Sequence, residues 1–387
     1  MSVYIQSIEA QVPETEYTQE FIRGLMERSV RASGKDARYL QRIYRHSGIE
    51  TRHSVIRDFA PDALKTPFFT TGPDGSLNTP DTRTRNDIYI AESRRLFTDL
   101  ARKAIDNCPN AKAADITHVV TVSCTGFYSP GPDYAIVREL GLAGNVQRFH
   151  IGFMGCQAAF PALKMATAFC RADTSAVVLV VCVELCSLHL QFTDTPDAIL
   201  AGALFADGGG AAIVSRREPV AGQAVFEMHD FESALIPDTE TKMAWLIGNQ
   251  GFDIVLSNSV PDIIDANIEH VLAPLLESRG FNAADIDTWA VHPGGKAILD
   301  KMQRSLGLKP EQIQPSRDIL RQYGNMSSAT ILFVLREILR APSPRPRGNV
   351  CAIAFGPGLT VEMGLMEKRP GRAEIQNLDP LNQAVSH

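Results

Sequence analysis

The sequence lacks the features that mark several large classes of protein. It has no Cys-x-x-Cys pair, and its seven cysteines are an odd number scattered through apolar segments, which argues against a disulfide scaffold or a zinc site. The longest strongly apolar run, AVVLVVCV at 176–183, is far too short to span a bilayer. The opening MSVYIQSIEAQVPETEY lacks the basic and apolar regions of a signal peptide. We therefore expect a cytoplasmic protein with reduced thiols, no metal and no membrane span.

An excess of basic residues is also missing. The chain has 38 Lys and Arg against 44 Asp and Glu, and the resulting net charge of −6 gives no reason to expect nucleic acid or an anionic membrane as a partner. The hydrophobic fraction of 44% and the charged fraction of 21% are ordinary for a globular protein. At 387 residues the chain can form one large domain or two.

Two stretches of the sequence resemble each other. AADITHVVTVSCTG begins at Ala113, and AADIDTWAVHPGGK begins at Ala283, 170 residues later. Each is typical of a short turn followed by a buried strand. The strand pattern AVVLVVCVE at 176 has a counterpart in NVCAIAFGPG at 349. Matched elements at nearly one spacing indicate an internal repeat.

The repeat predicts two pseudo-equivalent halves. Strands alternate with helical patterns in each half, which favours an α/β fold with helices covering the sheets. The stretch RREPVAGQ near residue 220 reads as a connection. We predict halves at 1–220 and 221–387, with a mobile tail after about residue 368.

Cys156 stands at the start of the apolar run GFMGCQAAFPALKMATAFC, which spans residues 152–170. A helix that is apolar on nearly every side belongs inside a large core. Its first turn collects unpaired N–H groups and the positive end of the helix dipole, which favour a thiolate and hence a lowered thiol pKa. Most free cysteines are small buried hydrophobic residues, so this stretch alone leaves the role of Cys156 open.

The repeat brings two more polar side chains to the same place. Gly155-Cys156 corresponds to Gly324-Asn325, 169 residues later, at the start of a second apolar helix pattern. His292 ends a buried strand in WAVHPGG and precedes a Pro-Gly-Gly turn. A thiol, an imidazole and an amide that converge at strand ends form a chemical site.

These three groups suit acyl transfer through a thioester. Cysteine supplies a nucleophile that can carry an acyl group, and histidine can take its proton. The imidazole and the amide can both donate hydrogen bonds to one developing oxyanion. Two such donors would stabilise the enolate formed when a malonyl thioester loses its carboxylate, and that carbanion could attack the acyl group on Cys156.

Four motifs, in order, are GFMGCQAAF, AVHPGGKAIL, YGNMSSATILFVL and AFGPGLTVEM. They resemble those of the chalcone synthase-like type III polyketide synthases, and the resemblance runs from about residue 1 to 367. It implies a thiolase-like αβαβα fold of five layers, a homodimer, and catalysis by Cys156, His292 and Asn325. The substrates implied are an acyl-CoA starter and malonyl-CoA, with no cofactor.

The resemblance also implies roles in substrate binding. Phe205, in ALFADGGGA, matches the family's gatekeeping phenylalanine, and the second gatekeeper falls on Ile254, which would widen that part of the cavity. Gly356 and Pro357 belong to a loop in which alanine replaces the family's first glycine. Arg42 aligns with a basic residue that holds the CoA phosphates.

Small residues indicate the starter. Thr125, Ser129 and Cys186 fall where related bacterial enzymes place the walls of a tunnel, and small side chains there imply a channel beyond the cyclisation cavity. We therefore expect a medium or long fatty acyl starter and an alkylpyrone or alkylresorcinol product. The sequence does not choose between the two ring closures.

Three other functions fit part of the pattern. A papain-like protease also uses cysteine, histidine and asparagine in this order, but no secretory signal or disulfide pattern accompanies them. A priming ketoacyl synthase of fatty acid synthesis shares the fold and the trio and takes an acyl carrier protein, but it lacks the HPGGKAIL and FGPG pattern. A degenerate subunit of a synthase would not need all three polar groups.

Overall fold

The computed structural model describes the chain except for residues 1, 31–33, 60–66, 74–76, 343–346 and 370–387. The tail expected to be mobile after about residue 368 therefore lies almost wholly outside the described residues. Within the described ranges, no helix combines the length and the apolar character that a bilayer crossing requires.

Most strands of the described residues join one mixed sheet in the order β13-β14-β15-β10-β1-β9-β8-β6-β7. The first half of the chain contributes β1 (Val3–Gln11), β6 (His118–Ser123), β7 (Gln147–Gly152), β8 (Val177–Leu185) and β9 (Asp207–Ser215). The second half contributes β10 (Val225–Leu235), β13 (Thr288–Val291), β14 (Gly348–Gly356) and β15 (Thr360–Arg369).

The two halves repeat the same strand pairing. In the first half β6 is parallel to β8, which is antiparallel to β9, which is antiparallel to β1. In the second half β13, β14, β15 and β10 follow in the same senses. The antiparallel pair β1–β10 joins the halves. The division predicted near residue 220 falls in the loop between β9 and β10.

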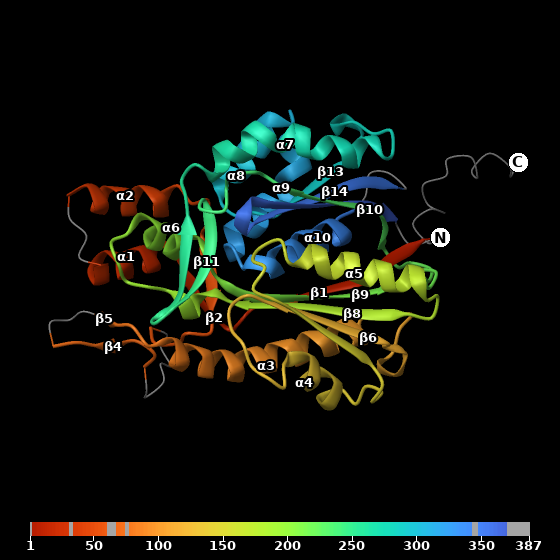
Figure 1. Cartoon of the computed structure of the whole chain (residues 1–387), viewed down its shortest axis with the longest axis horizontal. Helices are drawn as coiled ribbons and strands as arrows, with labels where there is room; N and C mark the ends of the chain where they lie inside the picture. The colour runs from red at the N-terminus through yellow and green to blue at the C-terminus, as the bar shows by residue number, and fades with distance from the viewer. Residues whose placement is uncertain (1, 31–33, 60–66, 74–76, 343–346, 370–387) are drawn as a thin grey trace, which may run out of the picture.

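The strands of the two halves form two layers of this sheet, and these alternate with helices to give five layers in all (Figure 1). The outer layer of the first half holds α3 (Thr82–Asp106) and α4 (Pro132–Glu139), and that of the second holds α7 (Val260–Glu277), α8 (Lys296–Ser305) and α9 (Pro310–Tyr323). The middle layer holds α5 (Ala159–Ala172) and α10 (Thr330–Arg340). Because sheets cover both sides of this layer, its helices are apolar on nearly every face. The five-layered α/β architecture expected from the sequence is confirmed.

Smaller elements gather at one end of the layers (Figure 1). They are α1 (Gln19–Val30), α2 (Gly34–Arg45), α6 (Pro196–Leu204) and the short strand pairs β2–β3 (Thr15–Thr18, Thr51–Ser54), β4–β5 (Thr70–Thr71, Leu77–Asn78) and β11–β12 (Met243–Gly248, Gly251–Leu256). Several of them wall the cavity described next.

Candidate active site

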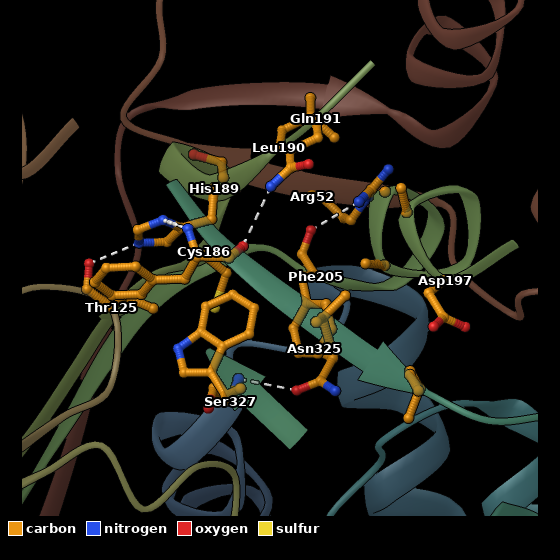
Figure 2. Close-up of a pocket in the computed structure, with 18 of the residues that line it drawn as sticks. Arg52, Thr125, Cys186, His189, Leu190, Gln191, Asp197, Phe205, Asn325 and Ser327 are labelled. Carbon is orange, nitrogen blue, oxygen red and sulfur yellow. Dashed lines mark hydrogen bonds between the residues drawn. The ribbon is translucent and has the colours of Figure 1, made fainter. Parts of the chain in front are cut away.

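A cavity of about 650 Å³ is lined by residues of both halves. This volume lies within the usual range of small-molecule sites. Cys156, His292 and Asn325 all line it, so the structure brings together the three polar groups that the repeat and the motifs singled out. The two sides of the cavity are seen in Figure 2, with Thr125 and Cys186 on one and Phe205 and Asn325 on the other.

Cys156 lies in a tight turn before α5, which begins three residues later, at Ala159. Gly155 has a φ of +90°, and a Cβ there would stand 2.5 Å from the ring of Pro357, so the turn requires glycine. Cys156 itself is partly exposed toward the cavity.

The surroundings of the Cys156 thiol disfavour its ionisation. Burial raises its pKa to about 11; hydrogen bonding from Ser327 and Asn325 lowers it, and the charge of Glu184 raises it further. The helix start led us to expect a thiolate with a lowered pKa, and this prediction is wrong for the free protein. Desolvation outweighs the favourable helix end, and the thiol is protonated at neutral pH.

His292 directly follows β13, and its backbone N–H continues the ladder by donating to the Ile353 carbonyl at 2.7 Å. The side chain is 1% exposed, and neither ring nitrogen has a hydrogen-bond partner within the described part of the chain. Burial lowers the pKa of His292 to about 3. A neutral imidazole in this position can donate one hydrogen bond and accept one proton from a ligand.

Asn325 is held by backbone and side chain together. Its backbone N–H donates to the Leu204 carbonyl, and its carbonyl accepts from the N–H of Ala206, both at 2.9 Å. Its Oδ1 accepts from the Ser327 N–H at 2.9 Å, and Nδ2 donates to the Gly294 carbonyl at 3.3 Å. Because Oδ1 faces an N–H donor, the amide orientation is fixed, and the second Nδ2 hydrogen can serve the Cys156 sulfur or a ligand oxygen beside it.

A buried carboxylate lies behind this site, and sequence reasoning missed it. Glu184, at the end of β8, accepts hydrogen bonds from the Cys124 N–H at 2.9 Å, from the Thr125 hydroxyl at 2.9 Å and from two serine hydroxyls. Burial raises its pKa, and these bonds oppose the rise. An acidic residue inside the apolar run VVLVVCVEL was the available signal, because carboxylates are almost never buried without partners.

Phe205 and Ile254 both line the cavity. Phe205 and Asn325 form an isolated parallel bridge. The Phe205 carbonyl accepts from Nη1 of the buried Arg52 at 2.7 Å (Figure 2). Arg52 thereby ties β3 to the segment that holds Asn325.

Two aromatic residues in the cavity wall were not predicted. Trp245, on β11, donates from Nε1 to the Cys124 carbonyl at 2.8 Å. His189 stacks on Phe252 at 4.1 Å between ring centroids, and its Nε2 lies 2.8 Å from the Thr125 carbonyl. Burial lowers the pKa of His189 to about 3, so the ring is neutral and supports the cavity wall through these contacts. Nothing in the sequence pattern of β11 or β12 points to these contacts.

Three residues assigned to substrate binding lie elsewhere. Ser129 is exposed and does not line the cavity, so its assignment to the tunnel wall is wrong for this chain. Arg42 is exposed on α2, outside the cavity. Gly356 does not line the cavity either, but a Cβ there would stand 1.5 Å from Oε1 of Gln157, so it acts by letting β14 approach the Cys156 turn.

Comparison with known families decides what kind of protein has this site. Residues 3–218 match the N-terminal domain of chalcone and stilbene synthases, and residues 227–370 match the C-terminal domain. The chain belongs to the chalcone and stilbene synthase family. It is therefore a type III polyketide synthase, a condensing enzyme of the acyltransferase kind.

Relatives and solved structures of this family agree. The alpha-pyrone synthesis polyketide synthase-like Pks18 of Mycobacterium tuberculosis is 35% identical over 328 residues, which are 84% of this chain and 80% of that protein. The crystal structure of PKS-I from the brown alga Ectocarpus siliculosus has a TM-score of 0.85 at 30% identity, covering 95% of this chain and 99% of that one. The 1,3,6,8-tetrahydroxynaphthalene synthase of Streptomyces coelicolor A3(2) has a TM-score of 0.82 at 28% identity, covering 95% and 100%.

Membership of this polyketide synthase family decides among the alternatives. A condensing enzyme of this family is neither a papain-like protease nor a degenerate subunit. The priming ketoacyl synthase is not favoured. The thiolase-like fold expected from the resemblance is confirmed as well.

Proposed function

We propose that this type III polyketide synthase carries its acyl group on Cys156 and forms the malonyl enolate against His292 and Asn325. The observation that carries the proposal is a thiol that shares one cavity with a fixed amide and with a buried imidazole that has no hydrogen-bond partner among the described residues. His292 has two buried ring nitrogens without partners among the described residues, and the Asn325 amide, fixed by Ser327, has its second N–H directed at Cys156. Buried polar groups are normally bonded, so a ligand oxygen is the expected partner.

Loading is a thioester exchange. The Cys156 sulfur attacks the acyl carbon of the starter, the new carbon–sulfur bond forms, and the bond to the CoA sulfur breaks. The CoA thiolate takes up the proton that Cys156 gives up, and a ring nitrogen of His292 can relay it. Because the resting thiol is protonated, this proton has to leave as the attack proceeds.

Extension begins when malonyl-CoA loses CO₂. The carbon–carbon bond to the carboxylate breaks, and its electron pair forms the thioester enolate, whose oxygen accepts hydrogen bonds from His292 and Asn325. The enolate carbon then attacks the acyl group, and Cys156 leaves as a thiolate that regains a proton. A His292 that stays neutral suits this step, since imidazolium could quench the carbanion.

The starter that we propose is a medium or long fatty acyl-CoA, and the product an alkylpyrone or alkylresorcinol. The lining of the cavity supports the first part, because most of its side chains are apolar. The relative named for alpha-pyrone synthesis supports a pyrone among the products. Each methylene of an alkyl chain gains about 0.8 kcal/mol when buried, so such a lining favours long chains.

We propose that Arg42 contacts the CoA phosphates. It is exposed on α2, and its guanidinium lies over the ring of Tyr39, 5.8 Å from the centroid. Phosphates are too polar to enter an apolar cavity, so a cation outside it is where they would be held.

We also propose a homodimer. Phe127 and Met154 are 39% and 40% exposed, and Phe127 packs against Phe153 with 5.3 Å between ring centroids. Clustered apolar side chains on a surface mark association sites. Light scattering after size exclusion would test this, and Met154→Lys should increase the monomer fraction. A wild-type protein that stays monomeric at micromolar concentration would contradict the proposal.

The whole function is tested by incubating the protein with malonyl-CoA and acyl-CoA esters from acetyl to palmitoyl, with cinnamoyl-type esters included. Mass spectrometry should find alkylpyrones or alkylresorcinols from octanoyl and longer starters, and none with Cys156→Ala. A preference for acetyl or cinnamoyl-type starters would contradict the fatty acyl part and leave the family and the trio intact.

A further inference from the structure

The cavity extends well beyond the three polar groups. Part of its wall comes from β2, α1 and the segment that follows β3, and carries seven apolar side chains. We call this part the N-terminal branch; its residues are Tyr17, Phe21, Ile22, Leu25, Ile56, Phe59 and Phe69. Its rings pack on one another, with 5.4 Å between the centroids of Tyr17 and Phe21 and 6.1 Å between those of Phe21 and Phe59.

In the part of the wall where the sequence predicted a channel, hydrogen bonds hold the side chain of Thr125. Thr125 is 1% exposed, and its hydroxyl donates to Glu184 and accepts from the Leu185 N–H, both at 2.9 Å. An alkyl chain that passed there would strip buried polar groups of their partners, at a cost of about 1–3 kcal/mol each. A route past Thr125 is therefore less favourable for an apolar chain than a route lined by apolar side chains.

Strand β3 connects the trio with the N-terminal branch. The Arg52 side chain donates a hydrogen bond to the carbonyl of Phe205, which forms a β-bridge with Asn325. On the same strand, Arg52 is the register partner of Tyr17 in the β2–β3 pair. Ser54 follows on the same strand and lines the cavity. Its hydroxyl donates to Ser187, whose hydroxyl donates to Asp207, so both hydroxyls are satisfied within the wall. Ser54 and Ser187 are thus small, satisfied side chains on this route, whereas Nε and Nη2 of Arg52 are buried without a hydrogen-bond partner among the described residues.

We propose that the N-terminal branch holds the alkyl tail of the starter and that α1 sets the longest chain that fits. This inference rests on the proposed use of fatty acyl-CoA. The tail lies along β3 toward Ile22 and Leu25, among the apolar side chains of the N-terminal branch. Phe21 is 38% exposed, so the branch reaches solvent there, and a chain longer than the branch gains nothing more. Up to that length each methylene improves kcat/KM about fourfold.

The test places a large ring in the branch. Ile22→Trp should lower kcat/KM for dodecanoyl-CoA relative to butanoyl-CoA on the order of 100-fold, which corresponds to about three displaced methylenes. The matched control is Ile263→Trp, the same change at a partly buried isoleucine on α7 outside the cavity, which should leave the ratio within twofold. A second variant, Phe59→Ala, widens the branch and should move the preferred chain to greater length.

Three results would overturn the inference. Equal losses for both esters in Ile22→Trp would mean that the branch holds the CoA arm, which all starters share. An unchanged ratio in Ile22→Trp together with a loss of long starters in Cys186→Phe would place the tail beyond Cys186. An unchanged chain preference in Phe59→Ala would also count against it. If the wild-type enzyme accepts no chain longer than butanoyl, it is the fatty acyl proposal itself that fails.

Discussion

The side-chain oxygen of Asn325 accepts a hydrogen bond from the backbone N–H of Ser327 at 2.9 Å (Figure 2). This bond turns the amide nitrogen toward the Gly294 carbonyl, at 3.3 Å. A Cβ on Gly294 would in turn lie 3.9 Å from Nε2 of His292. The amide and the imidazole thus both lie beside Gly294, as the proposed pair of donors to a single enolate oxygen requires.

Asn325→Ala should lower malonyl-CoA decarboxylation about 100- to 1000-fold and leave acyl loading of Cys156 largely intact, because one oxyanion donor is lost. Release of CO₂ from labelled malonyl-CoA and the mass of the acylated protein measure the two steps. Asn325→Asp is the matched control, since it keeps the acceptor for Ser327 and replaces the donor by a negatively charged oxygen, and it should be at least as slow. Loss of loading with normal decarboxylation would reverse the assigned roles.

The rate at which iodoacetamide alkylates Cys156 should rise about tenfold for each pH unit between 7 and 10. The reactive species is the thiolate, and burial raises the thiol pKa to about 11, so the ionised fraction grows throughout this window. A plateau below pH 7 would show instead that a charged pair with His292 overcomes the cost of burial.

The site of this reaction is part of the prediction. Burial raises the pKa values of Cys124 and Cys186 well above the usual range of a thiol. Both side chains are nearly inaccessible, whereas Cys156 keeps partial exposure. Peptide mapping should therefore find the alkyl group, and the acyl group of a starter, on Cys156. An acyl adduct on Cys124 or Cys186 would contradict its assignment as the nucleophile.

The repeat is what made this site predictable from sequence. It related Cys156 to Asn325 before any contact was known, and both residues follow a glycine of positive φ, at Gly155 and Gly324. Strand and helix periodicities report which residues are buried, and the alternation of strands with helices indicates an α/β fold. The five layers and the convergence of the trio could be anticipated for these reasons.

The walls of the cavity could not be predicted in the same way. Trp245, His189 and the aromatic residues of the N-terminal branch come from hairpins and a helix whose positions depend on long-range packing. Ser129 was misplaced because a small residue near Thr125 in sequence need not face the same space. The ionisation of Cys156 was misjudged because desolvation depends on the surrounding volume, which local sequence does not report.

Glu184→Gln should lower the pKa of Cys156 and speed its alkylation at pH 8, because the carboxylate charge raises that pKa. Glutamine keeps an acceptor for Cys124 and Thr125, so the free energy of unfolding should change little. Glu184→Leu instead leaves several buried donors without an acceptor, at about 1–3 kcal/mol each, and should be strongly destabilised. Urea denaturation measures the free energy of unfolding of both variants. Slower alkylation of Cys156 in Glu184→Gln would contradict the electrostatic role of the carboxylate.

Alanine substitutions at Gly356 and Gly155 should lower stability and the Cys156 acylation rate for different reasons. In Gly356→Ala the new Cβ meets the end of the Gln157 side chain, which is flexible, and about 1–3 kcal/mol of stability should be lost through overpacking. In Gly155→Ala the Cβ meets the ring of Pro357, and the φ of +90° adds backbone strain. Adding Gln157→Ala to Gly356→Ala should therefore restore most of the stability and most of the Cys156 acylation rate. Adding Gln157→Ala to Gly155→Ala should restore neither. A double-mutant cycle by urea denaturation tests this, and additive effects of Gly356→Ala and Gln157→Ala would show that Gln157 is not the residue that the new methyl group displaces.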